Sequence, residues 1–373
     1  MGTEVIRVEP GVDPAAAVEA AAAVLRRGGL VGLPTETVYG VGGRADLESA
    51  RRALHEVKER SAGKPFTVHI ALPGEAEWYV PGLRGVGARL ARKGWPGPLT
   101  LLLRVAEMQP APALAGLDAE TPEALYHEGV IGLRCPDHRV AQAILAKAGG
   151  PVVLASANRA GRRPPVTADE VLAELDGRMD VLVDAGRTRH GRASTVVRVE
   201  SGRYEIVREG VYDARMLDRL ARVTFLFVCT GNTCRSPMAA GIARKLLAER
   251  LGCSQEELAS RGVVVESAGT AGGFGGAAEH AVTVMGRRGV DVTGHRSQAL
   301  TTEMVREADH VFVMTEGHRA AVLQLDTEAG QRVALLLDAG DVADPIGGTE
   351  QDYEACANVL EAGLHARLRE IEL

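Results

Sequence analysis

Short apolar segments and amphipathic segments alternate regularly along the second half of the chain. Segments rich in β-favouring residues lie at 223–228, 263–266, 310–314 and 333–337. Apolar residues recur at helical spacing near 237–251, 277–288, 302–308 and 351–370. This alternation predicts a doubly wound parallel sheet with helices on both faces. We expect its ligands at the carboxyl ends of the strands.

The pattern of the first half is less regular. A helix is predicted over 13–27, because an alanine-rich segment lies between an Asp-Pro start signal and a Gly-Gly stop signal. Apolar strands follow at 30–33 and 66–70. Farther on, Thr167 and Glu170 form a capping box that opens another helix. Strands and helices are therefore mixed in this half as well.

Length and charge are consistent with two globular domains. The chain has 373 residues, enough for two separate cores. Residues 1–222 carry a net charge of +2 and the remainder −8, which gives −6 for the whole chain. Neither half is a polycation, so bulk charge gives no argument for nucleic-acid binding. The basic loop of Arg159, Arg162 and Arg163 leaves a local RNA contact open, with a solvated surface as the simpler interpretation.

The cysteines and the hydropathy pattern indicate the cellular compartment. The five cysteines are Cys135, Cys229, Cys234, Cys253 and Cys356. Their odd number and irregular spacing predict neither a disulfide framework nor a CxxC metal site. No apolar run approaches ~18 residues, and the N-terminus lacks a signal-peptide pattern. We expect a cytoplasmic protein with no membrane span and no bound metal.

The strongest candidate for chemistry is the segment from Val228 to Pro237. It joins a predicted strand to a predicted helix, with Ser236 as a candidate cap. Cys229 and Arg235 enclose five residues, a spacing that wraps a loop around one phosphate group. Backbone N–H groups and the helix dipole would attract the anion, Arg235 would hold two of its oxygens, and Cys229 would attack as a thiolate. The alternative, an inert cysteine in a turn, accounts less well for the Gly and Asn inside the loop.

This segment resembles the phosphate-binding loop of the low-molecular-weight protein tyrosine phosphatases, and the resemblance extends from about Val223 to the C-terminus. Asp344, followed by Pro345, stands at the position of the family's general acid. The resemblance implies that Cys229 forms a phosphocysteine, that Asp344 protonates the leaving group and then activates water, and that no cofactor takes part. Arg235 would hold the phosphoryl group, and the supporting loop residues would be Thr230, Gly231, Asn232, Thr233, Cys234 and Ser236.

Two loop residues have further expected roles. Ser236 can donate a hydrogen bond to the Cys229 thiolate. Cys234 could form a reversible disulfide with Cys229 that protects the nucleophile from overoxidation. Both roles require the two side chains to lie beside the nucleophile.

Two features favour phosphoarginine over phosphotyrosine as the substrate. Thr233 stands where the tyrosine phosphatases usually carry an aliphatic residue, and no aromatic residue follows Pro345. Both features resemble the bacterial protein-arginine phosphatases. A Thr hydroxyl can accept a hydrogen bond from a guanidinium, whereas tyrosine would stack on an aromatic wall. Phosphotyrosine remains the alternative. Arsenate reductase is a weaker one, because Cys253 and Cys356 form no close pair with which to relay a disulfide.

The first half contains several polar motifs that adjoin apolar segments. In chain order they lie at 34–42, 58–60, 66–70, 95–100, 132–136, 154–158, 194–197 and 208–210. Together they resemble the YrdC-type threonylcarbamoyl-AMP synthases over about residues 5–212. The resemblance implies a twisted mixed sheet with helices. It also implies a reaction in which threonine, bicarbonate and ATP give threonylcarbamoyl-AMP, which feeds modification of adenosine in tRNA.

The same resemblance assigns the binding residues. Threonine would contact Thr37, His69, Arg134, Ser156 and Ser194, and the nucleotide would contact Lys58, Arg60, Asn158 and Arg208. ATP is thus a substrate, which we expect to arrive with Mg²⁺. Ser61, Lys64 and Val130 depart from the family pattern at positions that concern ATP affinity.

The predicted domains are 1–212 and 223–373, with a linker at 213–222. The expected partners are threonine, bicarbonate, ATP, phosphorylated proteins, tRNA-modification proteins and double-stranded RNA. An RNA-binding module without synthase activity remains the alternative for the first domain.

Overall fold

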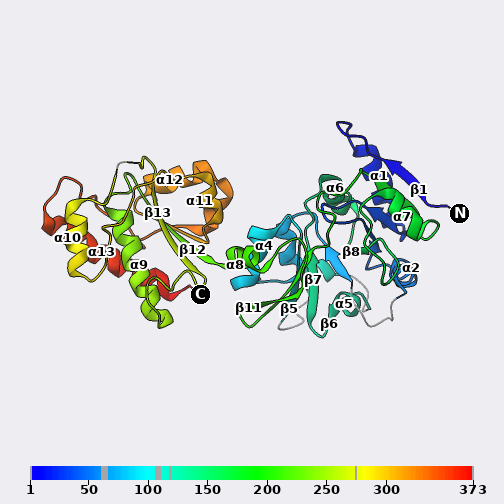
Figure 1. The fold of residues 1–373 in the computed structure, drawn as a ribbon, viewed down its shortest axis with the longest axis horizontal. Helices are drawn as coiled ribbons and strands as arrows, with labels where there is room; N and C mark the ends of the chain where they lie inside the picture. The colour runs from blue at the N-terminus through cyan, green and yellow to red at the C-terminus, as the bar shows by residue number, and fades with distance from the viewer. Residues whose placement is uncertain (1, 60–65, 106–110, 117–119, 274, 372–373) are drawn as a thin grey trace. The chain divides into compact units, whose positions relative to one another are not determined.

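The computed structural model describes residues 2–371 except 60–65, 106–110, 117–119 and 274. The chain divides into two compact units, Met1–Ala221 and Arg222–Leu373 (Figure 1). The segment predicted as a linker contains helix α8 (Ala214–Ala221), whose Leu217 is buried in the core of the first unit. Within the described residues, no helix combines the length and the apolar character that crossing a membrane requires.

The first unit is built on one 11-stranded mixed sheet. Its strand order is β1-β9-β2-β3-β8-β4-β7-β5-β10-β11, and β6 pairs with β7. The strands are β1 (Glu4–Arg7), β2 (Val31–Leu33), β3 (Gly40–Arg44), β4 (Thr67–His69), β5 (Leu99–Arg104), β6 (Tyr126–His127), β7 (Val130–Arg134), β8 (Val152–Ser156), β9 (Val181–Asp184), β10 (Thr195–Glu200) and β11 (Arg203–Arg208). The mixed sheet expected from the sequence is confirmed.

Helices pack on the first unit's sheet. They are α1 (Ala15–Arg26), α2 (Glu48–Lys58), α3 (Ala76–Tyr79), α4 (Gly85–Gly94), α5 (Glu120–Leu125), α6 (Arg139–Lys147), α7 (Ala168–Leu175) and α8. Helix α7 begins as the capping signal predicts, since Thr167 accepts a hydrogen bond from the backbone N–H of Glu170. Gly42 allows β3 to approach β8 closely, because a Cβ at this position would lie 2.0 Å from the carbonyl oxygen of Val153. This close pairing brings the loop before β3 to the end of β8.

The second unit contains a four-stranded parallel sheet in the order β13-β12-β14-β15. Its strands are β12 (Val223–Cys229), β13 (Val263–Gly269), β14 (His310–Val313) and β15 (Val333–Leu335). Its helices are α9 (Arg235–Leu251), α10 (Glu279–Arg287), α11 (Thr302–Glu307), α12 (Glu316–Leu325) and α13 (Glu350–Arg369). The parallel sheet predicted from the alternation of elements is confirmed.

Alternation along β12 explains why helices cover both faces of this sheet. Phe225 and Phe227 lie in a core that contains residues of α9, α10 and α13. Leu226 and Val228 lie in a second core, with residues of α11 and α12. Figure 1 shows α9 and α13 on one side of the β12–β13 pair and α11 and α12 on the other. Residue Cys229 ends the strand at the edge where a doubly wound sheet holds its ligands.

Helix α12 (Glu316–Leu325) was not predicted from the sequence. It has few apolar residues in regular spacing, and Gly317 lies in its first turn. The helix nevertheless begins at a cap, because Thr315 Oγ1 accepts a hydrogen bond from the backbone N–H of His318. Packing of Val322 into the second core then holds the helix on the sheet.

Candidate active sites

The loop between β12 and α9 runs from Cys229 to Arg235. Because α9 begins at Arg235, the N–H groups of Arg235 and Ser236, which have no helical carbonyl to bond, lie where this loop meets the helix. Ser236 was expected as the helix cap, and this is wrong. Its side chain is buried beneath the loop, and Cys234 precedes the helix instead.

Asn232 fixes the shape of the loop. Its φ of 54° is in the left-handed region, and its side chain is fully buried. Nδ2 donates to Ser236 Oγ at 2.8 Å and to Ser267 Oγ at 2.9 Å, and Oδ1 accepts from the backbone N–H of Gln298 at 3.0 Å. The backbone oxygen of Asn232 lies 2.7 Å from His295 Nε2. The amide is thus bonded at both ends, which holds the loop in a conformation that most residues avoid.

Ser236 lies next to the candidate nucleophile. Its Oγ is 3.0 Å from Cys229 Sγ and accepts a hydrogen bond from Asn232. Because that oxygen already accepts, its own proton points toward an acceptor. Cys229 Sγ is the closer one, since the carbonyl oxygen of Ala268 lies 3.4 Å away. Ser236 thus supplies a hydrogen-bond donor to the sulfur of Cys229.

Arg235 and Asp344 face the same loop. The guanidinium is buried, and its Nη2 donates to Asp344 Oδ2 while Nη1 donates to the carbonyl oxygen of Val342 at 3.1 Å. Its Nε has no partner among the described residues. Asp344 is exposed, so one end of its carboxylate faces solvent. The structure therefore brings Cys229, Arg235 and Asp344 together around one loop.

Two polar side chains, those of Tyr353 and Thr233, adjoin the thiol of Cys234. Cys234 Sγ lies 3.2 Å from the hydroxyl of Tyr353 on α13 and 3.6 Å from Thr233 Oγ1. Burial and the contact with Cys234 raise the pKa of Tyr353, so its hydroxyl stays protonated. Cys356 is also buried, and burial raises the pKa of its thiol to about 12. Cys356 is therefore an inert core thiol at neutral pH.

The sequence did not point to His318, on α12. Its Nε2 lies 2.9 Å from Thr230 Oγ1, and its Nδ1 lies 2.9 Å from Thr315 Oγ1. The available signal in the sequence was Thr315, a possible helix cap three residues before His318. This signal is weak, because the sequence does not show which loop faces the start of that helix.

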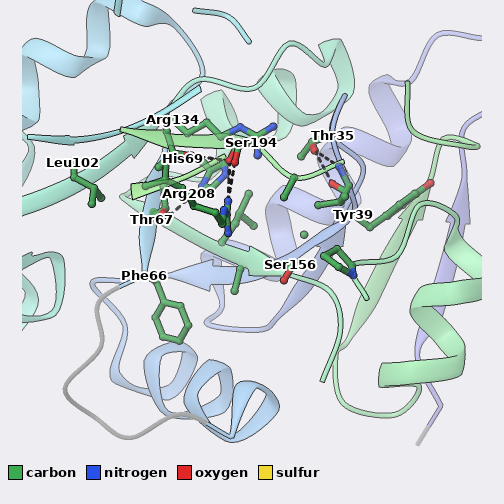
Figure 2. Close-up of a pocket in the computed structure, with 18 residues that line it drawn as sticks. Thr35, Tyr39, Phe66, Thr67, His69, Leu102, Arg134, Ser156, Ser194 and Arg208 are labelled. Atoms are coloured by element: carbon green, nitrogen blue, oxygen red, sulfur yellow. Dashed lines mark hydrogen bonds between the residues drawn. The ribbon is translucent and has the colours of Figure 1, made fainter. Parts of the chain in front are cut away.

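The first unit contains a polar pocket of about 180 Å³ at the ends of several central strands. Five residues predicted from the sequence line it: His69, Arg134, Ser156, Ser194 and Arg208. Figure 2 shows His69, Arg134, Ser194 and Arg208 grouped together, with Thr35 and Ser156 farther along the pocket. Thr37 is buried beside the pocket, where its hydroxyl accepts a hydrogen bond from Arg134 Nη2 at 2.7 Å.

Two guanidinium groups give the pocket its charge. Arg134 Nη2 also donates to Glu36 Oε1 at 2.8 Å, and both side chains are buried. Arg208 Nη2 donates to the carbonyl oxygen of Ser194 at 2.9 Å. Burial and the neighbouring Arg134 lower the pKa of Arg208. Because one carboxylate faces two guanidinium groups, the pocket suits an anionic ligand.

His69 is a neutral group in this pocket. Burial and the charge of Arg134 lower the pKa of His69 to about 3. Its Nδ1 lies 3.0 Å from the carbonyl oxygen of Thr67. A neutral ring whose Nδ1 donates to that carbonyl presents Nε2 as an acceptor.

Lys58 and Asn158 lie outside the residues that line this pocket. Lys58 Nζ donates to the carbonyl oxygen of Ser156 at 2.7 Å and to that of Asn158. The side-chain amide of Asn158 donates to the carbonyl oxygens of Arg159 and Arg162. Both side chains thus hold the chain just after β8. Arg60, Ser61 and Lys64 lie outside the described residues.

The described residues contain no group of three or more His, Cys, Asp or Glu side chains arranged to hold a metal ion.

Two family models match the chain. The model of the Sua5, YciO and YrdC family, described as telomere recombination, matches residues 23–210. The model of the low molecular weight phosphotyrosine protein phosphatases matches residues 224–372. The two matches thus correspond to the two compact units.

The two halves of the chain are similar to different curated proteins. Threonylcarbamoyl-AMP synthase of Pyrococcus abyssi is 34% identical over 180 residues, which cover 48% of this chain and 50% of that protein. The chain thus spans about half the length of the first curated relatives that it matches. Protein-arginine-phosphatase of Geobacillus stearothermophilus is 38% identical over 142 residues, which cover 36% of this chain and 87% of that protein.

Among solved structures, that of P. abyssi Sua5 complexed with L-threonine matches with a TM-score of 0.52 and 22% identity. The match covers 71% of this chain and 92% of that one. At this identity the likeness concerns the fold alone.

The substitution Gly269→Ala tests whether the tight packing under the loop matters. A Cβ at Gly269 would lie 2.5 Å from the carbonyl oxygen of Thr230 and 2.9 Å from the backbone nitrogen of Asn232. Because both atoms are backbone, the loop must move, and we expect binding of inorganic phosphate to weaken about tenfold. Isothermal titration measures the affinity. Gly294→Ala is the control, since a Cβ there has open space. Equal affinity in both variants would contradict the expectation.

The first unit should lose stability as the pH falls below about 6.5, the pKa of His69 in the unfolded chain. The folded chain binds that proton only near pH 3, so His69 lowers the free energy of unfolding between these values, by at most about 1.4 kcal/mol per pH unit. Urea titrations at several pH values measure it. Tryptophan fluorescence reports this unit, because Trp78 and Trp95 are the chain's two tryptophans.

The variant His69→Gln should have a shallower pH dependence than the unmutated chain. His127→Gln should keep the original dependence, because His127 is exposed. Identical slopes in all three proteins would show that His69 titrates normally.

Proposed function

The chain belongs to the Sua5/YrdC family in residues 23–210 and to the low-molecular-weight phosphotyrosine phosphatase family in residues 224–372. On that premise we propose that it is a bifunctional enzyme, a threonylcarbamoyl-AMP synthase joined to a protein phosphatase that works through a phosphocysteine. The observation that supports the phosphatase most directly is the grouping of Cys229, Arg235 and Asp344 around one loop. For the synthase it is the pocket with two guanidinium groups.

In the synthase unit, the amine of threonine and bicarbonate form a carbamate with loss of water. A carbamate oxygen attacks the α-phosphorus of ATP, and the bond to the pyrophosphate leaving group breaks. The Arg134 guanidinium pairs with the threonine carboxylate, and its buried bond to Glu36 keeps it oriented. Neutral His69 accepts a hydrogen bond from threonine, and Ser156 and Ser194 supply hydroxyl contacts.

ATP binds beside threonine in this proposal. Arg208 and Arg60 hold phosphate oxygens, and Lys58 and Asn158 shape the loop after β8. Such a site works by positioning the reactants and by balancing charge. ATP carries Mg²⁺ on its own phosphate oxygens, as nucleotide substrates commonly do.

The product would pass to proteins that modify tRNA. The exposed loop with Arg159, Arg162 and Arg163 precedes Pro164, which lines the pocket, and it offers a contact for double-stranded RNA.

In the phosphatase unit, Cys229 Sγ attacks phosphorus and forms the S–P bond while the bond to the leaving group breaks. Arg235 and the loop N–H groups hold the equatorial oxygens. Asp344 donates a proton to the leaving group. It then takes a proton from the water that cleaves the S–P bond, which restores the thiolate.

The substrate proposed for this unit is phosphoarginine in proteins. Thr233 lies in the loop beside Cys234, where its hydroxyl can accept a hydrogen bond from a guanidinium. Pro345 is followed by Ile346, which is exposed, and by glycines, so this segment offers no ring on which tyrosine would stack.

The two activities should separate by mutation. Lys58→Ala removes an ammonium that bonds two carbonyl oxygens after β8, so we expect loss of pyrophosphate release with retention of phosphatase activity. Cys229→Ser should give the reverse, because a serine hydroxyl is not ionised at neutral pH. Pyrophosphate release by the unmutated chain should require both threonine and bicarbonate. Release without threonine would count against the synthase.

Selectivity should depend on Thr233. The unmutated chain should hydrolyse phosphoarginine faster than phosphotyrosine, and Thr233→Ile should shift the ratio of the kcat/KM values toward phosphotyrosine by about tenfold, since one lost hydrogen bond has that size. Thr327→Ile is the control, because Thr327 is exposed and remote from the loop in sequence. Faster cleavage of phosphotyrosine by the unmutated chain would refute the proposed substrate.

A further inference from the structure

Thr230 is the first residue after the nucleophile, and it is exposed at the rim of the loop. Its hydroxyl oxygen has two contacts among the described residues. His318 Nε2 lies 2.9 Å away, and Arg235 Nη2 lies 3.5 Å away. The first is a normal hydrogen-bond distance and the second is long. The position of this hydroxyl is therefore set mainly by His318, which comes from another element 88 residues along the chain.

The contacts of the ring assign its tautomer. Thr315 Oγ1 accepts from the backbone N–H of His318 at 3.2 Å and lies 2.9 Å from His318 Nδ1. Within the described residues, the acceptor that the Thr315 hydroxyl proton can reach is His318 Nδ1. If Nδ1 accepts, the neutral ring carries its proton on Nε2, which then donates to Thr230.

The surroundings of the ring keep it neutral. His318 is buried, and burial together with the charge of Arg235 lowers its pKa. Asp344 and Asp341 act in the opposite direction with smaller effect. A ring with one donor and one acceptor matches the two hydroxyl groups that it joins.

We infer that His318 is a positioning residue of the phosphatase unit, and that it turns the Thr230 hydroxyl proton toward the phosphoryl group. The inference rests on the proposed phosphatase activity. With the ring in the assigned tautomer, Thr230 Oγ1 accepts from His318 Nε2, and it also accepts the long bond from Arg235, so its own proton is left to donate. Because Arg235, the proposed ligand of the phosphoryl group, lies beside this hydroxyl, we assign an oxygen of a phosphoryl group on Cys229 as the acceptor of that proton.

Such a donor acts most strongly in the transition state. Negative charge spreads over the equatorial oxygens as the phosphoryl group is transferred, and a fixed donor stabilises that charge without reorganisation. Without His318 the hydroxyl can rotate, and Thr230 can turn its proton to water. The consequence appears in kcat more than in KM.

A double-mutant cycle of His318→Leu and Thr230→Val tests the inference on the full chain. Each single variant should lower kcat for the phosphorylated substrate roughly ten- to a hundredfold with little change in KM, the size of one hydrogen bond to a charged group. The double variant should be no slower than the slower single variant, because both changes remove the same donor. His318→Gln should restore most of kcat, since its amide N–H can reach the position of Nε2.

Two further measurements separate positioning from stability. Nitrogen NMR of the imidazole should show the proton on Nε2 in the unmutated chain. Thermal unfolding should show that His318→Gln is folded even where His318→Leu is not. His365→Gln is the control, because His365 is exposed on α13 and its substitution should leave kcat unchanged.

Several results would overturn the inference. They are additive losses in the cycle, an unchanged kcat in His318→Leu, no recovery in His318→Gln, or a proton on Nδ1. An unmutated chain as inactive as Cys229→Ser would instead refute the phosphatase itself, and the NMR result would still test the assigned tautomer.

Discussion

The left-handed backbone of Asn232 is the constraint on which the second site depends. Curling a loop tightly enough to aim its N–H groups at one anion forces a residue into this region, which is unfavourable for side chains other than glycine. Asn232 offsets that cost through four hydrogen bonds, three from its buried amide and one to its backbone oxygen. One of them ends on Ser236, which in turn contacts the sulfur of Cys229, the proposed nucleophile. The loop shape and the contact of Ser236 with this sulfur thus depend on one hydrogen-bond network.

In the first unit, a buried ion pair between Arg134 and Glu36 fixes the geometry of the pocket. Arg134 ends β7, and Glu36 from the loop before β3 holds its guanidinium. Burying the Arg134 guanidinium without a partner would be costly. The Glu36 carboxylate offsets that cost and also fixes the orientation of the guanidinium. Close pairing of β3 with β8, which Gly42 permits, brings that loop to the pocket. In both units a carboxylate holds a buried guanidinium, that of Arg134 at the end of β7 and that of Arg235 at the start of α9.

The sequence predicted much of this arrangement because it depends on local patterns. The Cys229–Arg235 spacing, the strand before it and the helix after it are contiguous in the chain, so the loop could be recognised without a structure. The parallel sheet followed from alternation of elements in the same way. Helix α12 was missed, because its apolar pattern is weak and its stability comes from a cap and from packing on the sheet. His318 was missed with it, because a histidine in an unrecognised helix has no visible partner.

The sequence by itself determined the two fold classes, and it pointed to Cys229 as the candidate nucleophile and to the polar motifs, since each is encoded in a short segment. Only the tertiary structure decided that Ser236 contacts the sulfur and caps no helix and that His318 meets Thr230. It also decided that Lys58 stays outside the pocket lining and bonds two backbone carbonyl oxygens after β8. The physical reason is the same in each case. A hydrogen bond between residues far apart in the chain depends on how helices and strands pack, and neither composition nor spacing encodes that packing.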